Sequence, residues 1–317
     1  MFDHKRIKTP EKRDRDFRSL RVNRLINREL VLEIDNVLIA LKNLLERQCP
    51  AHVNKVMGYG PLLLVAAYAV KSNLDAIRYL LADTPPDPFR KPEFCICVSP
   101  NVRFLADLLS TLIIIRQSPK RYCKWYHRSG WRELRESLEL LSNEPGSKKK
   151  FSSQLQKQMQ ALEQMRIAYG ISKRDAENFR EIDWWPTLGQ FLSRKKKTKI
   201  KLRPYRFLNY FYTLFYSELS QDVHMSGAGI ARMFSKLLIQ SSDQDRETIL
   251  HRIKSNNYML SLIISVSIAT EINDLCRFDR GGKLTYIWKI LSGAWADADR
   301  LYKKRYKRLV ARHLSFS

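Results

Sequence analysis

Long hydrophobic runs are missing from this sequence of 317 residues. No segment reaches the roughly 18 uninterrupted apolar residues that a membrane-spanning helix needs. The three most apolar stretches each meet a charged side chain before that length, and they are residues 61–70, 104–115 and 258–269. We therefore expect these stretches to be buried helices of a large core, and we expect no membrane partner.

Cysteine is also scarce, at five residues, which is an odd number. Only Cys95 and Cys97 lie close together, and no second pair stands at metal-ligand spacing. The chain starts without an apolar leader segment. These features predict a cytoplasmic protein with free thiols, without a metal site and without a cofactor.

Acidic residues are few beside the basic ones: 32 Asp and Glu against 57 Lys and Arg, for a formal net charge of +25. A surplus of this size attracts phosphates through counterion release and steers long-range encounter. It favours nucleic acid as the partner, with RNA or single-stranded DNA ahead of duplex DNA. An acidic protein, an anionic membrane surface and a merely solvated basic surface are the weaker alternatives.

Sustained two-residue alternation and internal repeats are absent, whereas apolar residues recur at three- and four-residue steps. This pattern predicts an all-α protein, with one large bundle-like helical domain over residues 23–312 behind a basic arm of residues 1–22. The expected helices cover residues 23–47, 60–82, 102–117, 119–143, 151–169, 172–179, 204–224 with a bent continuation to 239, 243–275 and 283–312, with a short turn over residues 186–197.

Basic residues concentrate in the arm, in a segment before an aromatic helix, and in the last helix. Tyr302 and Tyr306 lie among the cations of the last helix, and such interleaving suits a single strand whose bases stack on rings. The alternative is a solvated face with both tyrosines packed inward, and for residues 205–216 the helical spacing favours core packing. The predicted nucleic-acid-binding residues are Arg194, Lys195, Lys196, Lys197, Lys199, Lys201, Arg203, Arg206, Lys303, Lys304, Arg305, Lys307 and Arg308.

One face of the aromatic helix is the leading catalytic candidate. Tyr216, Ser220 and His224 are each four residues apart, so a phenol, a hydroxyl and an imidazole share one helix face. Imidazole is the usual general acid and base near neutral pH. In this hypothesis His224 moves the proton, while Ser220 and Tyr216 orient it. The alternative is an ordinary polar histidine near a helix C-terminus, where the macrodipole favours it.

The segment from Tyr216 to Ser226 resembles the signature of an uncharacterised bacterial family of all-helical proteins, Tyr-Ser-x-Leu-Ser-x-x-x-His-x-Ser. Trp184 and Trp185 stand where that family carries a tryptophan upstream. A second family landmark, a basic residue followed four positions later by an acid, resembles Lys71 and Asp75, with Lys and Asp in place of Arg and Glu. The resemblance covers about residues 55–240 and names no reaction. It implies a family-like core over residues 55–240, with residues 243–312 as a C-terminal helical extension.

Such proteins look like HEPN-type domains of toxin and phage-defence systems, whose nucleases pair an Arg with a His four to six residues later. The resemblance implies cleavage of RNA without metal. Four pairs have this spacing, and chance alone yields one or two in so Arg-rich a chain. Arg246 and His251 form the best match and are the second catalytic candidate; the others are Arg47 with His52, Arg121 with His127, and Arg308 with His313.

Two functions follow from these patterns. The first is a nucleic-acid-directed effector of a bacterial defence or toxin system, including a metal-independent HEPN-like nuclease. The second is a non-catalytic subunit that binds nucleic acid or scaffolds a defence ribonucleoprotein, together with a partner protein. An interaction module for an acidic protein is a third option, and a homodimer stays open.

Overall fold

The computed structural model describes residues 24–48, 60–81, 97–143, 152–197, 203–216, 219, 243–276, 278 and 282–314. Almost all of these residues are helical and none forms a strand, which confirms the all-α prediction. The helices are α2 (Arg24–Gln48), α3 (Gly60–Leu81), α4 (Ser99–Gln117), α5 (Pro119–Asn143), α7 (Ser152–Ala168), α8 (Lys173–Glu177), the 3-10 turn η3 (Phe179–Glu181), α9 (Leu188–Lys197), α10 (Arg203–Phe211), the π-turn η4 (Tyr212–Tyr216), α13 (Asp243–Cys276), α14 (Lys283–Ala294), α15 (Ala296–Leu301), the π-turn η5 (Tyr302–Tyr306) and α16 (Lys307–Leu314).

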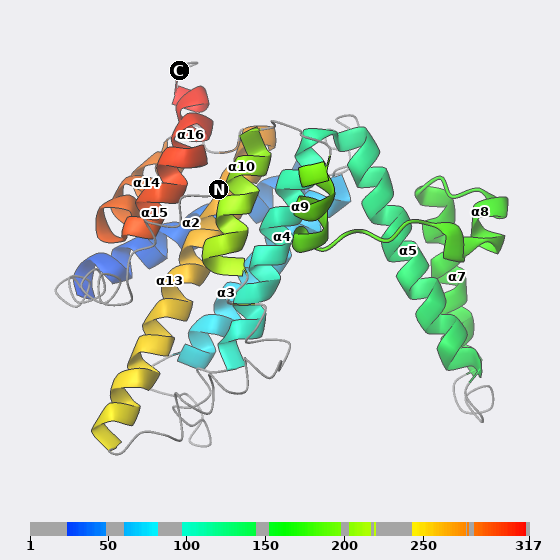
Figure 1. The fold of residues 1–317 in the computed structure, drawn as a ribbon, viewed down its shortest axis with the longest axis horizontal. Coiled ribbons are helices and arrows are strands. Elements are labelled where there is room, and N and C mark those ends of the chain that lie inside the picture. Colours follow the sequence, from blue (N-terminus) through cyan, green and yellow to red (C-terminus); the bar gives the residue numbers. More distant parts are fainter. Residues whose placement is uncertain are drawn as a thin grey trace.

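Helix α13 is the centre of the main bundle, where α2, α3, α4, α14 and α16 pack around it (Figure 1). Its residues 259–273 are buried without a break, because most side chains there are apolar or small, with Glu271 and Asn273 as the larger polar exceptions. The stretch Glu247–Cys276 is long and apolar enough to cross a membrane by length and composition, yet 83% of its most apolar window is buried inside the protein. It forms the buried core helix that the sequence predicts for residues 258–269.

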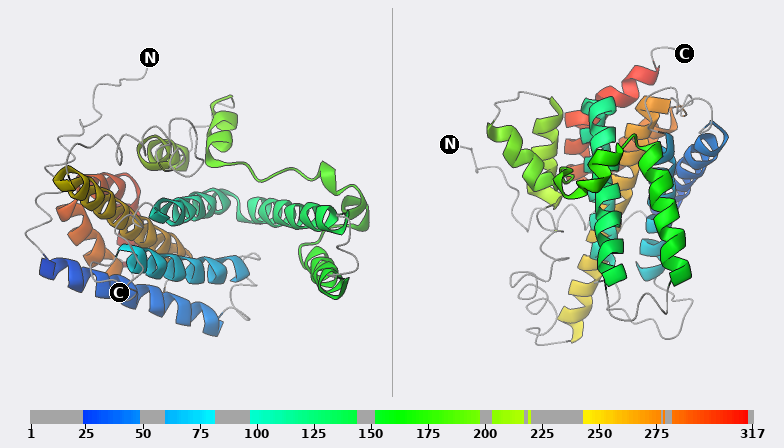
Figure 2. Two further views of the ribbon diagram at one scale, coloured as in Figure 1. Left: turned by 90° about the horizontal axis from the view of Figure 1, so that it is seen from below. Right: turned by 90° about the vertical axis from the view of Figure 1, so that its right-hand side faces the viewer.

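Helices α5, α7 and α8 and the turn η3 project from the bundle and have a small core of their own (Figure 1). We call this group of helices the arm. Seen from below, α4 and α5 follow one another nearly end to end, and α7 lies at the far end of the arm (Figure 2). Six buried side chains hold α5, α7 and η3 together, and Ala176 of α8 packs against them; the six are Trp131, Leu138, Leu162, Ile171, Phe179 and Ile182. Gly170, with φ of +62°, ends α7 in the left-handed conformation that the sequence suggests for it.

Two expectations about helix continuity are wrong. Residues 188–197 form helix α9 rather than a turn, because Thr187 and Gln190 cap each other's backbone N–H groups at 3.1 and 3.3 Å. The last helix is not continuous over residues 283–312, because Trp295 adopts an extended backbone with φ of −142° between α14 and α15. Its ring lies edge-on to Phe215, 6.4 Å away, and this contact with the aromatic helix accompanies the break.

Candidate functional site

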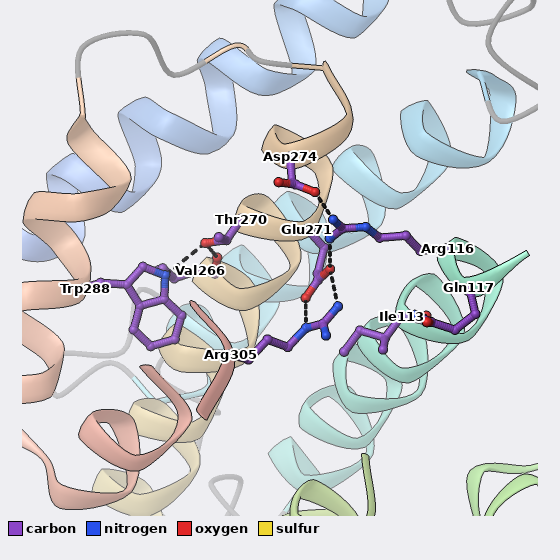
Figure 3. A network of polar contacts seen from close by, with 9 residues as sticks. All are labelled: Ile113, Arg116, Gln117, Val266, Thr270, Glu271, Asp274, Trp288 and Arg305. Carbon is purple, nitrogen blue, oxygen red and sulfur yellow. Dashed lines mark hydrogen bonds and ion pairs between the residues drawn. The ribbon is translucent and has the colours of Figure 1, made fainter. Parts of the chain in front are cut away.

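A buried carboxylate organises one end of the bundle. Glu271 of α13 is 2% exposed and accepts hydrogen bonds from Arg116 Nη1 of α4 and Arg305 Nη2 of η5, each at 2.8 Å (Figure 3). Arg116 also pairs with Asp274, one turn further along α13. Burial alone raises the pKa of Glu271, but the charges and hydrogen bonds of Arg305 and Arg116 outweigh it and hold that pKa below its usual value.

A pocket of about 530 Å³ opens beside this cluster, between the end of α4, the start of α10, and the last turns η5 and α16. We call it the basic pocket. Five of its nine lining residues are basic, and the lining consists of Arg116, Gln117, Pro204, Arg206, Phe207, Lys304, Arg305, Arg308 and Leu309. The pocket therefore joins the second and third basic segments of the sequence, which are almost a hundred residues apart.

The basic side chains of this pocket fall into two groups. Arg116 and Arg305 are neutralised by Glu271 and Asp274, and their side chains are only 17% and 11% exposed. Arg206, Lys304 and Arg308, in contrast, are exposed and form no ion pair with any acidic residue of the described part of the chain. The Lys304 ammonium lies 4.5 Å from the centroid of the Tyr210 ring. Three uncompensated charges thus converge on one recess, a geometry that suits a phosphate.

Among the other predicted binding residues, Lys303 and Lys307 are described and do not line the basic pocket. Lys303 pairs with Asp299 at 2.7 Å, and Lys307 is exposed but does not line the pocket. Tyr302 and Tyr306 stack on Trp288 at 5.7 and 4.6 Å, so the inward packing of these tyrosines is the observed arrangement. Lys199 and Lys201 lie outside the described residues, as do the side chains of Arg194, Lys195, Lys196, Lys197 and Arg203.

Tyr216 is the one described member of the leading catalytic candidate, since Ser220 and His224 lie outside the described residues. Its ring is 3% exposed beneath the Arg103 guanidinium, 3.4 Å from the ring centroid. The phenol donates to Asp107 Oδ1 at 2.5 Å, and burial, followed by this hydrogen bond, raises the pKa of Tyr216. The phenol is therefore held protonated, and it links the aromatic helix to α4.

The second catalytic candidate stands at the opposite end of α13. His251 is exposed, with Nε2 3.5 Å from Ser255 Oγ, and the side chain of Arg246 lies outside the described residues. Twenty residues separate His251 from Glu271, which amounts to about 30 Å along a helix. This pair and the basic pocket are consequently separate places on the molecule. No group of three or more His, Cys, Asp or Glu side chains in the described residues is placed to hold a metal ion.

Sequence reasoning missed the residues that support the pocket. Arg116, Glu271 and Asp274 each lie in or next to an apolar run, where they read as interruptions of that run. The sequence does mark the two acids, because Glu271 and Asp274 directly follow an apolar helical stretch, and a carboxylate buried there needs a cationic partner. Which of the 57 Lys and Arg residues supplies that partner depends on the packing of helices far apart in sequence.

Comparison with known protein families, with curated proteins and with solved structures finds no match to this chain. The resemblance to the helical family and to HEPN-type domains therefore stays a prediction.

Proposed function

We propose that this chain is a nucleic-acid-binding protein that holds the phosphates of a single strand in the basic pocket. The observation that carries the proposal is the convergence of Arg206, Lys304 and Arg308, without acidic partners among the described residues, on one recess. The partly buried Arg116 and Arg305 add hydrogen-bond donors to its lining. A flexible single strand can bend a phosphate into a recess, whereas the backbone of a stiff duplex follows a fixed course.

The proposal favours a binding subunit over a nuclease. The described part of the catalytic candidate, Tyr216, is a buried structural contact, and the pair at His251 lies far from the basic pocket. Nothing in the described geometry aligns a general base with the place where a phosphate would sit. The expected role is to bind or scaffold RNA or single-stranded DNA, and its biological setting in a defence or toxin system is part of the same proposal.

The test compares two triple variants that remove equal charge. Arg206→Gln/Lys304→Gln/Arg308→Gln empties the basic pocket of its free cations, while Lys289→Gln/Lys303→Gln/Lys307→Gln changes exposed lysines that do not line it. Binding of a labelled single-stranded oligonucleotide is measured from 50 to 300 mM salt. Three lost contacts of about 1 kcal/mol each weaken binding on the order of 100-fold. They also lower the slope of log K against log salt by about 2.

Equal losses in both triple variants would contradict the pocket as the site and leave only diffuse surface attraction. An affinity that does not change with salt would contradict phosphate binding altogether. The oligonucleotide is also expected to stay intact after long incubation without added metal. Its cleavage, abolished by His224→Ala, would instead establish the nuclease hypothesis.

A further inference from the structure

A second pocket, of about 670 Å³, lies at the junction where the arm leaves the bundle. We call it the junction pocket. It is lined by residues of α4, of α5, of the end of α7, and of the segment 185–188 that leads into α9. Figure 1 shows the chain between η3 and α9 crossing from the arm toward the bundle. None of the Lys and Arg residues in the described part of the chain lines it, although the sequence holds 57 of them. The two pockets therefore differ in charge, and the junction pocket is not built for phosphate.

Aromatic rings form much of the lining of this pocket. Tyr126 and Trp185 meet edge to face at 5.2 Å, and His127 lies flat on Tyr169 at 4.4 Å. The Trp185 backbone N–H donates to the buried Ser129 hydroxyl at 2.6 Å, which fixes the crossing segment against α5. The four rings are only half-buried, so part of their surface is available to a ligand.

Two carboxylates supply the charge of the junction pocket. Asp107 is already engaged, because it accepts from Tyr216 and, at 2.9 Å, from Arg103 Nε. Glu133 is exposed and forms no hydrogen bond or ion pair through its carboxylate with a described residue. Tyr126 and Glu133 both line the pocket, and burial and, after it, the charge of Glu133 raise the pKa of Tyr126. Glu133 is thus the acceptor that remains for a ligand.

We propose that the junction pocket binds an unpaired nucleobase, and guanine in preference to the others. Rings provide stacking surfaces for a planar heterocycle, and one carboxylate can accept both N–H groups that guanine presents side by side on its Watson–Crick edge. Adenine, cytosine and uracil do not offer two adjacent donors to one carboxylate. Because no described Lys or Arg lines the junction pocket, the phosphates of the strand stay outside it and bind at the basic pocket.

The inference rests on the proposed function, because that function supplies the strand from which the base comes. Helix α4 lines both pockets, with Asp107, Ser110 and Ile114 at the junction pocket and Arg116 and Gln117 at the basic pocket. Ten residues of helix separate Asp107 from Gln117, which amounts to about 15 Å. One strand can therefore reach both pockets along the same helix.

The experiment uses nucleosides, because they carry a base without a phosphate and do not need the basic pocket. Guanosine, adenosine, cytidine and uridine are titrated into the full chain, with binding followed by calorimetry and by tryptophan fluorescence. Guanosine is expected to bind saturably and at least tenfold more tightly than the other three. Glu133→Gln, which replaces one acceptor oxygen by a competing donor, is expected to weaken guanosine binding at least tenfold. Glu136→Gln, one helical turn away and outside the lining, serves as the matched control and leaves it unchanged.

The Arg206/Lys304/Arg308 triple variant is expected to lose oligonucleotide affinity but to keep guanosine binding, which supports two separate sites. If guanosine fails to bind while the oligonucleotide still does, the base proposal is overturned and the proposed function stands. If neither binds, both fall. Spermidine serves as a probe for an organic cation: binding of spermidine but not guanosine, weakened by Glu133→Gln, would overturn the base proposal and make the pocket an amine site.

Discussion

At the scale of single residues, the cluster around Glu271 shows how this protein buries charge. The Glu271 side chain is 2% exposed. A carboxylate buried to this extent is compatible with the folded state only when cationic groups pair with it and donate hydrogen bonds to it. Arg116 and Arg305 provide these partners from helices on either side of α13, so the cluster also ties α4 to the C-terminal turns (Figure 3). The same two guanidinium groups line the basic pocket, and stability and binding therefore share residues.

Removing that carboxylate charge should be costly. Glu271→Gln leaves two buried guanidinium groups with Asp274 alone as counter-charge, and we expect the free energy of unfolding to fall by about 3–5 kcal/mol. The matched control is Glu139→Gln, which breaks a surface pair with Arg180. That change is expected to cost less than about 1 kcal/mol. Urea unfolding followed by circular dichroism measures both, and equal effects would show that the buried cluster contributes nothing special.

At the scale of elements, helix boundaries marked by local chemistry are predictable and long-range interruptions are not. Pro119 and Gly60 stand at the observed starts of α5 and α3, as the sequence indicates. The capping pair of Thr187 and Gln190 is equally local, and α9 could have been recognised from it. The break at Trp295 follows from no local signal of that strength, because it accompanies packing against Phe215, 80 residues earlier.

Three cationic residues of the basic pocket could be predicted from the sequence, but their arrangement in space could not. Clusters of Lys and Arg identify Arg206, Lys304 and Arg308 from sequence alone. The sequence does not predict that these three residues line one pocket, because that depends on how α10, η5 and α16 are placed beside the end of α4. The junction pocket could not be predicted from the sequence either, since its lining combines α4, α5 and α7 with the segment at Trp185.

The small core of the arm should unfold separately from the bundle. Phe179 is 6% exposed among the side chains that join α5, α7 and η3. Phe179→Ala is expected to lower the local opening free energy of α7 and α8 by about 3 kcal/mol. Hydrogen exchange should then accelerate in these two helices while protection of α13 is unchanged. In the control Leu109→Ala, in the main core, protection of α13 is expected to fall; a uniform loss in the Phe179 variant would mean that arm and bundle form one cooperative unit.

At the scale of the whole molecule, the two pockets differ in charge although the chain carries a net charge of +25. Five cationic side chains line the basic pocket, and none of the described Lys and Arg residues lines the junction pocket. A strand guided by long-range attraction would meet cations first and aromatic rings second. The surplus also opposes compactness, and this repulsion grows as acidification protonates the carboxylates.

Stability should accordingly fall in acid, in part through Glu271. Its folded-state pKa is held below the value of about 4.3 that an unfolded chain gives it, so its contribution is present above pH 4.3 and is lost as pH falls through the folded pKa. The difference in unfolding free energy between the wild type and Glu271→Gln is therefore expected to shrink between pH 5 and pH 2. Urea titrations at several pH values measure it, and a constant difference would contradict a depressed pKa.

The position of helix α13 in the sequence also affects how the protein folds during its synthesis. It is the centre of the bundle, yet it begins at residue 243, long after α2, α3 and α4 have left the ribosome. Those three helices expose the apolar faces that α13 will cover until more than three-quarters of the chain has been made. During this stage the nascent protein exposes the apolar surface that α13 later buries. A chaperone must cover that surface, or the earlier helices must pack against one another until α13 is made.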